Sequence, residues 1–162
     1  MPPNQGVPTM PVMQDEPELL FEPFPSDDLR RFVEDNVATF TMAMTGALDY
    51  QPVGYFLRQE RGEWVGGCLG YVWANYLHVQ WLWVAASLRG RGHGARLLRA
   101  AETMAVENGA ARATLDTFNP AAKAFYLRQG YEIFGTLADY PPGYSKFFLR
   151  KMLFGPGSAP AR

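Results

Sequence analysis

Residues 82–98 read LWVAASLRGRGHGARLL, an apolar strand pattern, a short loop with three glycines at alternate positions, and then a helical pattern. A helix N-terminus leaves backbone N–H groups unpaired and carries positive partial charge. Glycine has no Cβ and lets the backbone approach an anion, while Arg89 and Arg91 add positive charge. The stretch therefore predicts an anion site at the glycine turn, residues 89–94.

The glycine turn has other interpretations. A glycine-rich loop can simply begin a helix, and the turn by itself is equally compatible with that reading. Gly90, Gly92 and Ala95 also match the dinucleotide fingerprint G-x-G-x-x-G/A, and Asp116 lies 24 residues past Gly92. That fingerprint opens directly from the first strand of a βαβ unit, whereas five residues separate Val84 from Gly90 here, so it fits poorly. A Walker loop is excluded because no Lys and Ser/Thr pair follows the glycines.

The patterns on both sides of the turn predict a mixed sheet with helices. Strands are expected over residues 53–59, 64–73, 76–85, 113–117, 131–137 and 145–152. Helices are expected to begin at Ser26, near Gly92 and at Asn119-Pro120. The first three strands have short connections and should form an antiparallel meander. The order predicts an α/β (α+β) fold with a mixed, largely antiparallel sheet of about six to seven strands and helices on both faces.

The chain length favours one compact domain. With 162 residues and 48% hydrophobic content, the chain can bury one core of ordinary size. Proline-rich and glycine-rich ends predict a flexible N-terminal segment over residues 1–18 and a flexible tail over residues 154–162. A single domain is expected over residues 19–153. Glycines 66, 67 and 70 in the second strand predict a bulge or a close backbone approach.

Composition excludes several classes of partner. Lys and Arg total 15 against 16 for Asp and Glu, so there is no basic field for nucleic acid. The single cysteine, Cys68, and two histidines argue against a disulfide framework and make a metal site unexpected. No basic stretch followed by an apolar segment and no bilayer-length apolar run is present. We therefore expect a soluble cytoplasmic protein with no metal, no nucleic acid and no membrane partner.

Two motifs carry a resemblance to a known family. Arg89, Gly92 and Gly94 fill the pattern Gln/Arg, two residues, Gly, one residue, Gly/Ala, and the run resembles the signature region of the GCN5-related N-acetyltransferases (GNAT). A second element follows in the usual order, namely Asn119, Ala122, Phe125-Tyr126 and Gly130-Tyr131. The resemblance covers about residues 64–152, and the N-terminal helix region resembles the family only in its general character.

The resemblance implies acetyl-CoA as the acyl donor and a site for it. The strand ending at Val84 and the strand starting near Ala113 would separate, and the pantetheine arm would pair with main-chain groups along the first of them. Backbone amides of the glycine turn would hold the pyrophosphate. The cofactor-binding residues implied in this way are Leu82, Val84, Arg89, Gly90, Arg91, Gly92, Gly94, Ala95 and Asn119.

Tyr126 and His78 are the catalytic candidates. The resemblance implies that Tyr126 lies beside the sulfur and donates a hydrogen bond to the leaving thiolate, although an aromatic packed on its helix is the alternative. The family often has a glutamate as the base six residues before the position matched to Val84, where this chain has His78. An imidazole titrates near about 6.5 and can accept a proton at neutral pH. The alternative is that His78 is a half-exposed strand residue without a catalytic role and that a chain of water molecules acts as the base.

The acceptor is expected to be a primary amine of a small molecule. The aromatic and acidic candidates for its pocket are Trp73, Tyr76, Asp139 and Tyr140, which suit a cationic amine. Core or rim packing is the favoured interpretation for Trp81 and Trp83. Attack would be direct, in a ternary complex. Alternatives are acetylation of a protein N-terminus or lysine, a catalytically silent acyl-CoA-binding module, and a nucleotide-binding oxidoreductase; a homodimer is compatible with the sequence.

Overall fold

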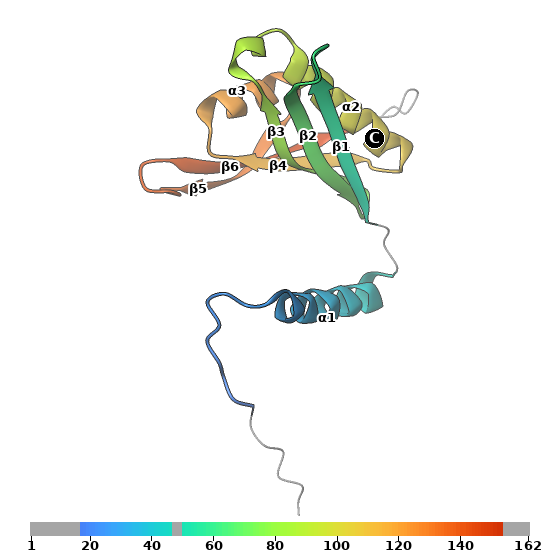
Figure 1. Ribbon diagram of the computed structural model, residues 1–162, viewed down its shortest axis with the longest axis vertical. Helices are drawn as coiled ribbons and strands as arrows, with labels where there is room; N and C mark the ends of the chain where they lie inside the picture. Colours follow the sequence, from blue (N-terminus) through green and yellow to red (C-terminus); the bar gives the residue numbers. More distant parts are fainter. Residues whose placement is uncertain (1–16, 47–49, 154–162) are drawn as a thin grey trace, which may run out of the picture. The chain divides into compact units, whose positions relative to one another are not determined.

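The computed structural model describes residues 17–46 and 50–153 (Figure 1). The chain divides into two units, Met1–Met44 and Thr45–Arg162, which are described separately. The flexible ends predicted over residues 1–18 and 154–162 lie outside the described residues, apart from residues 17 and 18. Within the described ranges, no helix is long and apolar enough to cross a membrane.

The first unit contains the predicted N-terminal helix, α1 (Asp27–Thr45). The Ser26 hydroxyl oxygen accepts a hydrogen bond from the backbone N–H of Leu29 at 3.3 Å, which satisfies one of the unpaired donors of the first turn. Gly46, with φ of +83°, follows the last helical residue. The predicted start at Ser26 is confirmed.

The second unit is the predicted mixed sheet, with six strands in the order β1-β2-β3-β4-β6-β5. The strands are β1 (Gln51–Arg58), β2 (Trp64–Trp73), β3 (Tyr76–Val84), β4 (Arg112–Thr117), β5 (Glu132–Ala138) and β6 (Ser145–Met152). The β3–β4 pair is parallel and every other pair is antiparallel, so the expected meander and the fold class are confirmed. The helices are α2 (His93–Glu107) and α3 (Pro120–Arg128), with a short 3₁₀ helix at Ala86–Leu88.

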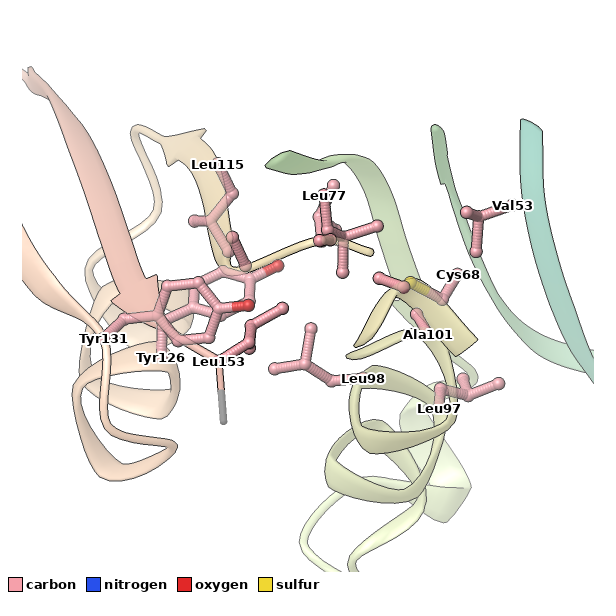
Figure 2. Close-up of a cluster of buried hydrophobic side chains, with 14 of the residues drawn as sticks. Val53, Cys68, Leu77, Leu97, Leu98, Ala101, Leu115, Tyr126, Tyr131 and Leu153 are labelled. Carbon is pink, nitrogen blue, oxygen red and sulfur yellow. The ribbon is translucent and has the colours of Figure 1, made fainter. Parts of the chain in front are cut away.

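One face of the sheet forms the core with α2 and α3 (Figure 2). Leu97, Leu98 and Ala101 of α2 are buried against strand residues such as Leu77, because they recur at helical spacing on one side of the helix. Tyr126 of α3 belongs to the same cluster. The two helices thereby fix the ends of β3 and β4, where the candidate site lies.

A bulge in β3 changes which side chains face this core. Leu69 pairs with Trp81 and Gly70 with Val79, so Gln80 has no partner on β2. Val79 is buried before the bulge, whereas Trp81 and Trp83 after it are 70% and 53% exposed. The extra residue shifts the alternation by one position. Of the two kinds of packing expected for Trp81 and Trp83, core packing is therefore excluded and rim packing remains. The predicted irregularity at Gly70 is confirmed.

Candidate active site

The strands β3 and β4 separate soon after they pair. Their ladder contains three residue pairs and ends at His78 and Thr114. Beyond this point β3 continues to Val84 paired with β2, and β4 continues to Thr117 paired with β6. The gap leaves an open edge on β3 to which an extended ligand can add in the manner of another strand. The family resemblance implied such a separation of the two strands, with the pantetheine arm of the cofactor between them.

The glycine turn closes one end of the gap. Val84 ends β3, and the chain reaches α2 through Gly90 and Gly92, which have φ of +74° and +84°. Gly92 is the N-cap of α2, and no side chain caps the helix there. The first turn also contains no acidic residue. The unpaired backbone N–H groups of this helix start are therefore available to an anion.

Arg89 holds the glycine turn in place. Its Nε donates a hydrogen bond to the carbonyl oxygen of Val84 at 2.9 Å, which ties the turn back to the end of β3. The Arg91 side chain is exposed. Both arginines of the motif are exposed, and Arg89 in addition shapes the turn.

Tyr126 lies in the core beside two other aromatic rings. Its side chain meets those of Phe125 and Tyr131 edge to face, with ring centroids 5.1 and 5.7 Å apart, respectively. Burial, followed by the neighbouring Cys68, raises the pKa of Tyr126 to about 12. No hydrogen bond joins its hydroxyl to any residue that the structure describes. Tyr126 is therefore a protonated phenol at neutral pH with its donor unused.

Asn119 begins α3 as predicted. Its Oδ1 accepts hydrogen bonds from the backbone N–H groups of Ala121 at 2.9 Å and Ala122 at 3.3 Å, and Pro120 occupies the first helical position. The side chain also lines a cavity of about 680 Å³. Capping thus fixes Asn119 at the edge of this cavity.

That cavity lies between the β4–α3 turn and the loop that joins β5 and β6. Three aromatic rings dominate its walls, and the lining residues are Phe118, Asn119, Pro120, Tyr140, Pro141 and Tyr144. Asp139 is not among them, because its Oδ1 accepts a hydrogen bond from the Gly143 N–H at 2.7 Å and closes the loop. Phe118 was not among the predicted site residues, although its position directly before the Asn119-Pro120 cap indicates that it lies near Asn119.

His78 occupies a second cavity, of about 390 Å³, where β3 and β4 part. Trp73 and Tyr76 line it together with His78, so these three predicted residues do come together. Thr114, Phe134 and Arg150 complete it from the neighbouring strands. Sequence reasoning missed these three because they become neighbours only through the strand order. Burial lowers the pKa of His78 below its usual 6.5, which keeps the imidazole neutral at neutral pH.

The two catalytic candidates lie on opposite faces of the sheet. Leu77 and Val79 point into the core, so His78 between them points to the other face. Tyr126 belongs to the core. An unused phenol donor on the core face and a neutral imidazole at the last β3–β4 pair, on the other face, are therefore the two candidate groups.

The sequence is similar to those of known acetyltransferases. A sequence model of the acetyltransferase (GNAT) family matches residues 11–131. Blasticidin-S acetyltransferase of Streptomyces morookaense is 43% identical over 95 residues, 58% of this chain and 70% of that protein. Acetyltransferase Atu2258 of Agrobacterium fabrum is 30% identical over 124 residues, 76% and 90% of the respective chains.

A solved structure supports the same assignment. The crystal structure of a protein from Agrobacterium tumefaciens, assigned as an acetyltransferase, superposes with a TM-score of 0.80 at 27% identity. The match covers 83% of this chain and 98% of that one. The resemblance inferred from the two motifs is thereby confirmed. This chain belongs to the GNAT family of acetyltransferases.

Proposed function

We propose that this enzyme transfers the acetyl group of acetyl-CoA to a primary amine of a small molecule by direct attack in a ternary complex. The observation that carries the proposal is the gap between β3 and β4, which begins at His78 and leads to the uncapped start of α2. Tyr126 belongs to the core on the other face of the sheet, and we propose that its hydroxyl reaches this gap. Both candidates can address one reacting centre there without a covalent enzyme intermediate.

The chain's own groups fit acetyl-CoA, which supplies the activated acyl group. The open edge of β3 from Leu82 to Val84 offers main-chain groups to an extended arm. A Cβ built at Gly90 or Gly92 meets no atom within 4 Å, so the backbone there is bare toward solvent. Together with Arg91, Gly94 and Ala95, this turn would hold the pyrophosphate. Asn119 would contact the cofactor from the start of α3.

The two side chains have complementary tasks. His78, which is neutral at neutral pH, accepts the proton of the attacking amine directly or through a water. Tyr126 donates a hydrogen bond to the departing sulfur. Its pKa of about 12 lies well above the roughly 8.5 of a thiol, so complete proton transfer would be uphill by roughly 5 kcal/mol. Tyr126 therefore stabilises the thiolate by hydrogen bonding, and solvent supplies its proton.

The size and the aromatic walls of the cavities support a small molecule as the acceptor. A concave cavity of about 680 Å³ with aromatic walls has the size of a site for a small molecule. Aromatic faces also attract a cationic amine, and Trp73, Tyr76 and Tyr140 are the contacts we propose, with Asp139 adding negative charge nearby. The relative that acts on blasticidin S supports a small-molecule acceptor. A polypeptide amine is the alternative acceptor.

An amine panel tests the proposal. Free-thiol release from acetyl-CoA is followed with blasticidin S, simple primary amines and short peptides, and acetyl-CoA binding is measured by thermal shift beside NADH. We expect release with a small amine and stabilisation by acetyl-CoA. Release with peptides alone would indicate a protein acetyltransferase, and tight acetyl-CoA binding without release would indicate a silent binding module. Stabilisation by NADH alone would overturn the assignment of the cofactor site.

A further inference from the structure

A buried ionic cluster lies beneath the candidate site, and none of the proposed chemistry uses it. Glu102 of α2 is the one charged side chain that is buried among the described residues. Its Oε1 accepts a hydrogen bond from the Tyr131 hydroxyl at 2.9 Å, and its Oε2 pairs with Lys151 Nζ at 2.7 Å. A carboxylate out of water is tolerated only when its oxygens are paired in this way.

The cluster joins residues from three parts of the chain. Glu102 comes from α2, Tyr131 from the junction of α3 and β5, and Lys151 from β6. The Lys151 ammonium also lies 5.5 Å from the centre of the Tyr131 ring. Burial and the Glu102 charge raise the pKa of Tyr131 well above its usual range, so its hydroxyl remains a donor. The cluster is thus saturated, with each charged atom matched to a partner.

Tyr131 connects this cluster to Tyr126. The backbone N–H of Tyr131 donates to the carbonyl oxygen of Tyr126 at 3.1 Å. The two rings meet at an interplanar angle of 63°, side by side in the core (Figure 2). Tyr131 is therefore fixed at its backbone by Tyr126 and at its hydroxyl by Glu102. Tyr126 has no such bond at its own hydroxyl, so ring packing alone directs it.

We infer that Glu102, acting through the Tyr131 hydroxyl, is a positioning residue that sets the orientation of Tyr126 toward the reacting sulfur. The inference rests on the proposed function, in which Tyr126 donates to the leaving thiolate. A hydrogen bond to charge that develops during reaction is sensitive to displacement, and a shift of about 1 Å can cost as much as 100-fold in rate. An apolar cluster of similar volume would pack equally well but would hold no ring hydroxyl in one place.

A double-mutant cycle tests the inference. Tyr131→Phe keeps the ring and removes the hydroxyl, and we expect kcat to fall about tenfold with KM for acetyl-CoA unchanged. In the Tyr126→Phe background the same substitution should have no further effect on kcat. Equal losses in both backgrounds would mean that Tyr131 is merely structural, and would overturn the inference while leaving the proposed function intact. If Tyr126→Phe alone leaves kcat unchanged, the proposed role of Tyr126 fails and the inference fails with it.

A matched pair of variants separates the hydrogen bond from the charge. Glu102→Gln with Lys151→Met keeps an acceptor for Tyr131 and should retain a higher kcat than Glu102→Leu with Lys151→Met, which leaves the hydroxyl without its acceptor. Equal kcat values for the two pairs would overturn the inference. NMR of ¹³C-labelled tyrosine provides a readout that needs no acceptor. The Tyr126 ring signal should shift or broaden in Tyr131→Phe, and an unchanged signal would contradict the proposed link.

Discussion

The imidazole of His78 stacks on the ring of Tyr71, its direct partner across the β2–β3 ladder, with centroids 4.7 Å apart and planes 14° apart. Tyr71 in turn stacks on Tyr50 at 4.8 Å. These rings shield the imidazole on one side, and burial lowers its pKa. A neutral imidazole beside the gap is the state that a general base requires.

The first prediction concerns the pH dependence of the reaction. Because the pKa of His78 lies below 6.5, the base stays neutral to lower pH, and the acid limb of kcat/KM should fall below pH 6.5. His78→Gln should remove that limb and lower the plateau by about 100-fold. The profiles are compared with one amine acceptor, so that the titration of the amine itself is common to both.

Tyr71→Leu is the matched control for this prediction. This substitution removes the stacked ring and lets water reach the imidazole, so the acid limb of kcat/KM should move upward toward pH 6.5. The plateau of kcat/KM should stay closer to the wild-type value than it does in His78→Gln. An acid limb that is the same in His78→Gln and in the wild type would exclude His78 as the base and favour a water chain.

The second prediction distinguishes Tyr126 from Tyr131 by the effect of each substitution on protein stability. The Tyr126 hydroxyl has no hydrogen bond within the described residues, so Tyr126→Phe should lower kcat by about 10- to 100-fold and leave Tm and KM for acetyl-CoA nearly unchanged. Tyr131→Phe loses a buried bond to Glu102, and should lower Tm by several degrees, as expected for about 1–3 kcal/mol. A large fall in Tm for Tyr126→Phe would show that its hydroxyl is structural.

The local signals in the sequence were sufficient for most of the elements. A helix was expected to begin near Gly92, and Gly92 is the N-cap of α2 with a positive φ. Asn119-Pro120 was expected to cap α3, and the capping bonds are present. Turn and cap residues act within a few positions of the chain, so their effect can be predicted without knowing the tertiary partner.

The missed features depend on partners distant in sequence. The glycines of β2 indicated a bulge, but its place at Gln80 on β3 depends on how β3 meets β2 and has no signal around Gln80 itself. Glu102 is of a residue type that is rarely buried, and only its partners Tyr131 and Lys151 explain why its charge is tolerated there. The placement of β6 between β4 and β5 likewise could not be read from the order of the elements. These features depend on pairing between residues that are far apart in the sequence, which local sequence patterns do not predict.

The third prediction tests the glycine turn with two glycines in the same backbone conformation. Gly92 and Gly109 have φ of +84° and +85°, and a Cβ at either meets nothing within 4 Å. Alanine at each position should therefore cost a similar amount, about 1–2 kcal/mol, from left-handed backbone strain alone. Gly92→Ala should also weaken acetyl-CoA binding by at least about tenfold, because its Cβ stands where the backbone approaches the pyrophosphate.

Gly109→Ala, at the far end of α2, should keep the wild-type affinity. Titration calorimetry and thermal unfolding of the two variants provide the measurements. Equal affinity in both variants would remove the turn from the cofactor site.

The fourth prediction concerns the bulge that places His78. A Cβ on Gly70 would overlap the carbonyl oxygen of His78 and lie 3.2 Å from both the His78 carbonyl carbon and Val79 Cα, all backbone atoms that cannot rotate away. Gly70→Ala should therefore separate β2 from β3 locally, lower stability by more than about 3 kcal/mol and reduce kcat through the displaced imidazole. Gly54→Ala on β1 is the control, because its nearest contacts are side-chain atoms at 3.4 and 3.5 Å. A Gly70→Ala variant as stable as Gly54→Ala would contradict the register at Gln80, and with it the direction in which His78 points.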